Sequence, residues 1–101
     1  MRALAVEIRN VRHKGLKAFI ERDATKGLPA VHVDKIRDIV AFLLEAESPD
    51  EVLALTRYSP HRLKGDRAGI VSLSVTPNWR ITFFHDAATT EIVDLDFEDY
   101  H

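Results

Sequence analysis

Hydrophobic and polar positions follow two different periods along the chain, and the change of period predicts where helices and strands lie. Residues 3–9 alternate between the two classes, which is typical of a half-buried strand. From His13 the spacing becomes helical, and we expect this first helix to end at Gly27 and Pro29. After Pro29 an apolar stripe recurs every three or four positions and predicts a second helix. The residues of that stripe are Val33, Ile36, Ile39, Val40 and Leu43.

The second half of the chain is predicted to be mainly strand. Ser48 as an N-cap, with Pro49 after it and Glu51 three positions on, predicts a short helical turn through Leu55. Beyond it, three stretches alternate apolar and polar residues and are separated by short breaks. The stretches are residues 71–75, 79–84 and 93–98. We therefore expect an antiparallel meander, which the strand at residues 3–9 can join. The predicted class is α+β, with two N-terminal helices packed on one face of a twisted antiparallel sheet.

The length and composition describe one small domain. A chain of 101 residues, 46% hydrophobic and 30% charged, can build a single core over residues 1–101 but not two. The absence of cysteine excludes a disulfide framework, a thiolate zinc site and a cysteine nucleophile. No apolar run reaches the roughly 18 residues of a membrane span, and Glu7 comes too early for a signal peptide. We expect a cytoplasmic protein with no membrane partner.

The net charge of −2 hides an uneven distribution along the chain. Ten of the 14 cations lie in residues 1–17 and 57–85, five in each block, and each block contains one acid. Residues 86–101 contain six acids and no Lys or Arg. The overall basic balance that would indicate nucleic acid directly is absent. The two basic blocks could meet in space and contact phosphate, or they could be ordinary surface charge.

The histidines do not predict a metal site. None of the five is paired at the i, i+4 helical spacing of zinc ligands or alternates with another on a strand. No serine lies in a Gly-x-Ser-x-Gly turn, and the glycine spacing does not fit a phosphate-binding loop. His32 and His85 are expected at the surface, at the ends of elements. We expect neither a metal ion nor a cofactor.

One cluster of residues suits a particular reaction. His61 lies within a few residues of Lys64 and other cations, and strand alternation puts Arg80 on the face opposite Trp79. RNA can be cut without a metal ion when its own 2′-hydroxyl attacks the adjacent phosphate, which requires a base, an acid and cations. Histidine suits proton transfer near neutrality, and Lys and Arg suit the phosphate oxyanion. A surface turn and a strand-face charge would explain the same residues, so the hypothesis requires that folding bring them together.

Four segments, in register from about Ile8 to His101, carry a family resemblance. They are His13-Lys-Gly-Leu-Lys17, His61-x-Leu-Lys64-Gly65-Asp66-Arg67-x-Gly69, Asn78-Trp79-Arg80-Ile81-Thr82-Phe83 and Glu98-Asp99-Tyr100-His101. Together they resemble the HigB-type toxins of the RelE/ParE superfamily of toxin–antitoxin systems. The resemblance implies two N-terminal helices on a twisted antiparallel sheet. It also implies a ribosome-dependent, metal-independent endoribonuclease that cuts messenger RNA in the A site and so inhibits translation. The implied partner is a small helix-turn-helix antitoxin. The toxin is expected to contact operator DNA only indirectly, through this antitoxin.

The resemblance also implies roles for single residues. The positions that match the family's catalytic set are His61, Lys64, Arg80, Asp99, Tyr100 and His101. The positions taken as RNA contacts are Lys14, Arg62, Arg67 and Asn78, of which Asn78 matches one near the codon bases. The division of acid and base roles among His61, Asp99 and His101 stays open.

Three departures from the family pattern bear on activity. Ile70 and Val71 stand where family members often carry aromatics, and Pro60 precedes His61 where relatives can carry proline after the histidine. The chain is also acidic, whereas RNA-binding members tend to be basic. Because phosphate contacts need Lys and Arg at the surface that meets RNA, the hypothesis requires the two basic blocks to converge.

Two other functions remain open at this point. A ParE-like toxin shares the superfamily fold but inhibits DNA gyrase by protein contact, and it would not need a convergent set of His, Lys, Arg and Tyr. The terminal Asp99-Tyr100-His101 argues against that alternative. An inactive relative that only binds its antitoxin and tunes repression is the second alternative, which the acidic balance and the missing aromatics favour.

Overall fold

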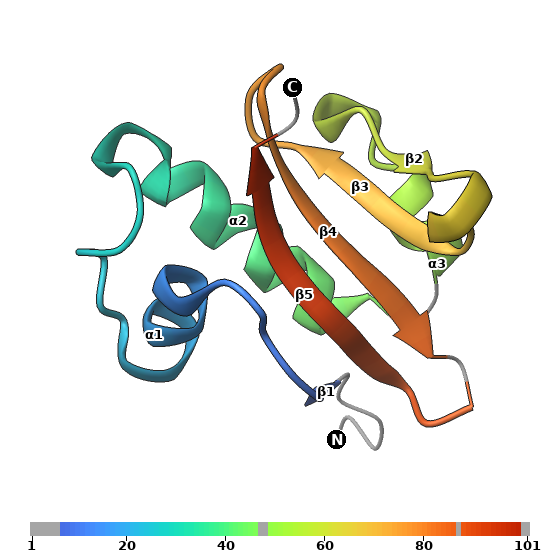
Figure 1. Ribbon diagram of the computed structural model, residues 1–101, viewed down its shortest axis with the longest axis horizontal. Helices are drawn as coiled ribbons and strands as arrows, with labels where there is room; N and C mark the ends of the chain where they lie inside the picture. Colours follow the sequence, from blue (N-terminus) through green and yellow to red (C-terminus); the bar gives the residue numbers. More distant parts are fainter. Residues whose placement is uncertain (1–6, 47–48, 87, 100–101) are drawn as a thin grey trace.

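The computed structural model describes residues 7–46, 49–86 and 88–99, which form a five-stranded sheet with helices against it (Figure 1). The helices are α1 (Lys14–Arg22), α2 (Val33–Glu45) and α3 (Pro49–Leu53), with 3₁₀ turns η1 (Ala30–His32), η2 (Thr56–Tyr58) and η3 (Gly65–Arg67). The strands are β1 (Glu7–Ile8), β2 (His61–Arg62), β3 (Ile70–Ser74), β4 (Trp79–Asp86) and β5 (Glu91–Asp99). The order across the sheet is β1-β5-β4-β3-β2. The predicted α+β class is confirmed.

One core joins the helices to the sheet. The whole predicted stripe of α2 is buried, as are Leu16 and Phe19 of α1. These side chains form one cluster with the inward-facing residues of the sheet. The sheet contributes Val71, Leu73, Ile81, Phe83, Ile92, Leu95 and Phe97. Figure 1 shows α2 behind β4 and β5, so the helices cover one face of these strands and the other face is left for polar groups.

The first helix ends earlier than the sequence predicts. It stops at Arg22, because Asp23 adopts a left-handed conformation (φ 57°) that aspartate tolerates better than most residues. The Asp23 amide donates to the Phe19 carbonyl at 2.9 Å and closes the last turn. Gly27 has another role: a Cβ placed there would lie 2.6 Å from the Cα of Gly15. Two backbone segments therefore touch at a point that tolerates only glycine.

The sheet is mixed, and not purely antiparallel as predicted. β3, β4 and β5 form the expected antiparallel meander. β1, however, pairs with β5 in the parallel direction, which is possible because the intervening chain forms a long crossover. Only Glu7 and Ile8 of the predicted strand at residues 3–9 are strand in the described part; residues 3–6, like the predicted N-cap Ser48, lie outside the described residues. The two-residue β2, which the pattern did not predict, pairs with β3 at the opposite edge.

A bulge in β5 changes which side chains reach the core. Thr82 pairs with Asp96 and Phe84 with Val93, so two residues of β5 oppose the single residue between them on β4. Asp94 occupies the bulge in a left-handed conformation (φ 54°). The alternation predicts Val93, Leu95 and Phe97 on the core face, and the prediction is wrong for Val93. Ile92 is buried in the core instead, and Val93 lies on the other face, opposite Phe84.

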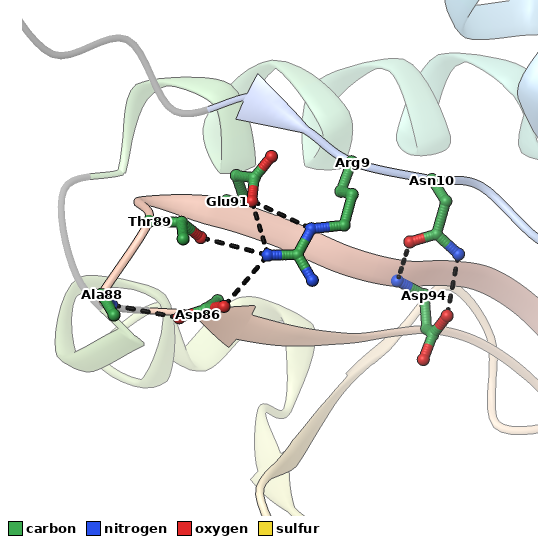
Figure 2. Close-up of polar contacts among 7 residues, drawn as sticks. All are labelled: Arg9, Asn10, Asp86, Ala88, Thr89, Glu91 and Asp94. Atoms are coloured by element: carbon green, nitrogen blue, oxygen red, sulfur yellow. Dashed lines mark hydrogen bonds and ion pairs between the residues drawn. The ribbon is translucent and has the colours of Figure 1, made fainter.

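The segment after β1 is fastened to the β4–β5 hairpin by side chains (Figure 2). Arg9 Nε and Nη2 donate to the Glu91 carboxylate at 2.9 and 2.6 Å, and Nη2 also reaches Asp86 at 3.1 Å. These hydrogen bonds from Arg9 lower the pKa of the Glu91 carboxyl. Asn10 secures the bulge, because its amide donates to the Asp94 carboxylate at 2.8 Å and its carbonyl accepts from the Asp94 backbone at 2.9 Å.

No helix in the described part of the chain is both long and apolar enough to cross a membrane.

Candidate active site

The face of the sheet that the helices leave uncovered, called here the open face, gathers polar side chains in register. His61, Ser72, Thr82 and Asp96 lie opposite one another across β2, β3, β4 and β5. Ser74, Arg80 and Glu98 form the next polar row. Neighbouring strands lie about 4.8 Å apart and paired residues share a face. The fold therefore brings His61 and Arg80, 19 positions apart in the sequence, to the same face.

Glu98 lies at the centre of the charged part of this face. Its carboxylate accepts both Arg67 guanidinium nitrogens, Nη1 at 2.9 Å and Nη2 at 2.5 Å, and it also accepts the Thr82 hydroxyl. The hydrogen bonds from Arg67 hold the pKa of the Glu98 carboxyl below its usual range, although partial burial acts in the opposite direction. The hydroxyl of Thr82 and the charge of Arg12 lower this pKa further.

Cations from both basic blocks of the sequence act on this carboxylate. Arg12 belongs to the first block, and its backbone amide donates to the Leu95 carbonyl of β5 at 2.8 Å, which holds this segment beside the strand. Arg67 and Arg80 belong to the second block; the former forms an ion pair with Glu98 and the latter is its cross-strand neighbour. Arg67 and Arg80 therefore share the open face, and from the first block the charge of Arg12 also acts on Glu98.

The loop that carries the predicted catalytic residues is anchored at both ends. His61 is exposed on β2, and the Leu63 amide donates to the Ile70 carbonyl at 2.8 Å, so the pairing with β3 continues past the strand. Lys64 follows, exposed, just before η3. Gly65 (φ 66°) and Gly69 (φ 92°) both adopt positive φ, which glycine reaches without strain. The loop is thus a defined hairpin at the edge of the open face.

Of the three predicted C-terminal catalytic residues, the structure describes Asp99. Asp99 is exposed and is the last residue of β5, where it pairs with Trp79. Because Glu98 pairs with Arg80, strand alternation puts Asp99 on the Trp79 side and not on the open face. Tyr100 and His101 lie outside the described residues. Figure 1 shows β5 ending beside the loop between β3 and β4.

The predicted RNA contacts are distributed around the sheet. Arg67 lies on the open face. Arg62 pairs with Val71, so strand alternation puts it on the side of β2 opposite His61. Asn78 is exposed in the β3–β4 turn, next to Trp79, at the same end of the sheet as Asp99. Lys14 is exposed at the start of α1. The structure therefore gathers some of the predicted contacts on one face and leaves others beyond it.

The first helix contributes a histidine that the sequence did not assign a role. His13 is the N-cap of α1, and its Nδ1 accepts the Leu16 amide at 3.0 Å. The same ring meets Phe97 edge-on, with centroids 5.4 Å apart, and Phe97 in turn stacks on Trp79 at 4.7 Å. This role is structural, because the capping bond and the ring contact both fix the start of the helix against the sheet.

Sequence reasoning missed Glu98, Thr82 and Ser72 as members of the site. Thr82 and Ser72 are almost fully buried, and Ser72 Oγ has no hydrogen-bond partner among the described residues. The alternation of residues 79–84 that placed Arg80 on the open face also places Thr82 there, so that signal was available. The pairing between Glu98 and Arg67 has no local signal in the sequence, because the loop geometry decides it.

Two expectations about individual residues change with the structure. Val71 is buried in the core, so its lack of an aromatic ring alters packing and removes no exposed contact. His85 was expected at the surface, but both of its ring nitrogens are buried and lack hydrogen-bond partners within the described segments. Strand alternation puts His85 on the core side of β4, opposite the buried Ile92.

Across residues 7–46, 49–86 and 88–99, no three His, Asp or Glu side chains are grouped as a metal ion would require.

The α+β fold agrees with what comparison with known proteins finds. Residues 9–101 match the family model described as the RelE-like toxin of the type II toxin–antitoxin system HigB. The chain is also 42% identical over 96 residues to the protein named Endoribonuclease HigB of Proteus vulgaris. The matched residues make up 93% of this chain and 99% of that protein. The protein is therefore a RelE-like toxin of a type II toxin–antitoxin system. Within that class the chain belongs to the HigB family.

Proposed function

We propose that the chain cleaves messenger RNA on translating ribosomes by a metal-independent reaction. Membership of the HigB family and 42% identity to a protein named Endoribonuclease HigB make it an endoribonuclease toxin. The observation that carries the finer proposal is that Arg80, and Arg67 through its ion pair with Glu98, lie on the face that also carries His61. Cations and a titratable imidazole on one exposed face supply the groups that this reaction needs.

The reaction proceeds by transfer within the RNA itself. The 2′-oxygen attacks the adjacent phosphorus, the bond from phosphorus to the 5′-oxygen breaks, and the products are a 2′,3′-cyclic phosphate and a free 5′-hydroxyl. A base removes the 2′-hydroxyl proton and an acid supplies a proton to the departing 5′-oxygen. We assign these transfers to His61 together with the terminal residues Tyr100 and His101; Asp99, which lies on the Trp79 side of β5, is assigned none. Lys64 and Arg80 stabilise the negative charge that develops on the phosphate oxygens.

The remaining predicted contacts position the message. Arg67 and Arg62 flank the loop of Lys64, and Asn78 lies at the end of the sheet where Asp99 ends β5. Lys14 is a peripheral cation at the start of α1. Phosphate groups are held by cations of this kind in a salt-dependent way, because binding releases counterions. Three acids of the C-terminal block are offset by local ion pairs, because Glu98 is paired with Arg67, and Asp86 and Glu91 with Arg9.

A toxin of a type II system has an antitoxin partner. We propose that this partner is a small helix-turn-helix protein, that it carries the contact with operator DNA, and that the toxin reaches DNA only through it. Ribosomes and messenger RNA place the activity in the cytoplasm.

The test is cleavage of a defined message on purified translating ribosomes, with a gyrase supercoiling assay run in parallel. We expect the wild-type protein to cut the message in the A site and to leave gyrase active. The His61→Ala variant serves as the control for contaminating nuclease. An intact message with inhibited gyrase would establish the ParE-like alternative. An intact message with active gyrase would establish an inactive relative that only binds its antitoxin.

A further inference from the structure

An exposed aromatic side chain lies on the open face, beside the charged groups. Three large hydrophobic side chains are exposed among the described residues: Val31 in η1, Leu44 in α2 and Phe84 in β4. Phe84 alone of the three belongs to the open face, because it alternates with the core residue Phe83. Its exposed fraction is 40%, which is high for a phenylalanine in a central strand. The ring is therefore accessible on the open face.

The neighbours of Phe84 support the ring without covering it. Ile70 on β3 and Val93 on β5 lie directly opposite, so the three side chains form an apolar row across the open face. On the β3 side the chain reaches this row through Gly69, where a Cβ would lie 3.5 Å from Cε1 of the Phe84 ring. A larger side chain at Gly69 would extend from that Cβ over the ring. Glycine therefore leaves this side of the ring open.

The row is next to the groups proposed to act on RNA. Along β4, Phe84 is two residues from Thr82, whose row contains His61, and four from Arg80. At about 3.4 Å per residue these separations are roughly 7 and 14 Å. Single-stranded RNA is bound where cations follow its backbone and an aromatic ring stacks on a base. The open face carries both features, with the row of His61 and Thr82 between Phe84 and Arg80.

We propose that Phe84 is a stacking platform for one base of the messenger RNA, adjacent to the phosphodiester that is cut. The proposal rests on the proposed function and extends it, because it names a contact that none of the predicted site residues provides. RNA is the occupant that the surroundings favour, since the adjacent row contains His61 and the row beyond it contains Arg80. The stack fixes the position of the base while His61 and the terminal residues carry out the proton transfers.

The experiment measures single-turnover cleavage of a ribosome-bound message as the toxin concentration is varied. Phe84→Leu retains an apolar side chain and removes the ring, whereas Phe84→Trp keeps an aromatic surface. The matched control is Leu44→Ala, which removes an apolar side chain of similar exposure (37%) from α2. Thermal melts accompany every variant, so that an effect on folding is separated from an effect on binding.

We expect Phe84→Leu to raise the half-saturating toxin concentration about tenfold, within the usual effect of losing one stacked base. The maximal rate should be unchanged, because a contact made equally in the bound and transition states affects binding alone. Phe84→Trp should restore the wild-type value, and Leu44→Ala should not change it. A message with 2-aminopurine near the cut site, and a 2′-deoxy sugar to prevent cleavage, should lose fluorescence with wild-type toxin and less with Phe84→Leu.

Three results would overturn the inference. If the wild-type protein cleaves the message and Phe84→Leu has the same half-saturating concentration, the proposed function stands and the stacking contact is disproved. Equal losses in Phe84→Leu and Phe84→Trp, with lowered melting temperatures, would show that the ring has only a packing role. Normal cleavage by Phe84→Leu with weakened antitoxin binding would assign the row to the protein partner. Failure of the wild-type protein to cleave would instead contradict the proposed function itself.

Discussion

Glu98 and Arg67, 31 positions apart, form a two-pronged ion pair that joins the loop of the predicted catalytic residues to the last strand. The pair holds η3, which contains Arg67, against the open face. It thereby positions Lys64, which lies between β2 and η3. It also offsets one of the cations that would otherwise face RNA. Both consequences follow from a carboxylate that sequence reasoning did not include among the site residues, and they lead to the first prediction.

We predict that Glu98→Gln destabilises the protein at neutral pH and not in acid. The pKa of Glu98 is lowered in the folded protein, chiefly by the hydrogen bonds from Arg67. Its stabilising contribution is therefore complete above the ordinary glutamate pKa of 4.5 and is lost as the pH falls through the lowered folded value. We expect a loss of about 1 kcal/mol near pH 7, at the upper end for partly exposed ion pairs.

Urea unfolding of both proteins near pH 7 and near pH 3 measures this difference. Asp66→Asn, which neutralises an exposed carboxylate in the same loop, is the matched control and should show little change at either pH. An equal destabilisation of Glu98→Gln at both pH values would show that the charge of Glu98 has no part in the effect.

We predict that His61→Ala and Lys64→Ala each abolish growth arrest while the protein stays folded. Both side chains are exposed, so their removal leaves no cavity. Loss of a proton-transfer group costs a factor of about 10²–10⁴ in rate, and loss of a cation at the phosphate has a comparable effect. Cleavage on ribosomes and melting temperature are the measurements, and His32→Ala is the control. Full toxicity of both variants would remove this loop from the site.

We predict that Gly15→Ala is strongly destabilising although it adds a single methyl group. A Cβ at this position would lie 2.2 Å from the carbonyl oxygen of Gly27. This oxygen belongs to the backbone, so it cannot move aside as the end of a flexible side chain could. We expect a loss of about 3 kcal/mol in the free energy of unfolding, at the upper end for overpacking. Gly65→Ala is the comparison: its surroundings are open, so only the strain of positive φ applies, about 1 kcal/mol. Similar losses in the two variants would disprove the backbone contact.

We predict that deletion of His101 lowers the single-turnover rate at least about tenfold, or 1.4 kcal/mol in barrier, without changing the melt. Terminal residues are usually tolerant of removal because few contacts hold them. Here Leu95 and Phe97 anchor β5 in the core to within a few residues of His101. The His101→Gln variant, which keeps the chain length, should show the same loss. An unchanged rate in both variants would exclude His101 from catalysis.

Much of the fold could be predicted because it depends on local patterns. The apolar stripe of α2 and the alternation in β3 and β4 repeat within a few residues, so the sequence alone determines which side of each element faces the core. The same alternation put Arg80 on the open face, and the spacing of motifs placed the chain in the HigB family. The sequence thereby determined the class of protein and several of its candidate residues.

Tertiary structure decided the features that depend on distant partners. The α1 helix ends at Arg22 because Asp23 can take a left-handed conformation there, and the bulge at Asp94 is fastened by Asn10, 84 positions away. Val93 faces the open side for that reason, and Phe84 gains its apolar row. The ion pair of Arg67 with Glu98 has the same origin. Hydrophobic period is a property of neighbouring residues, whereas register, bulges and the convergence of charges are set by contacts between segments far apart in the chain.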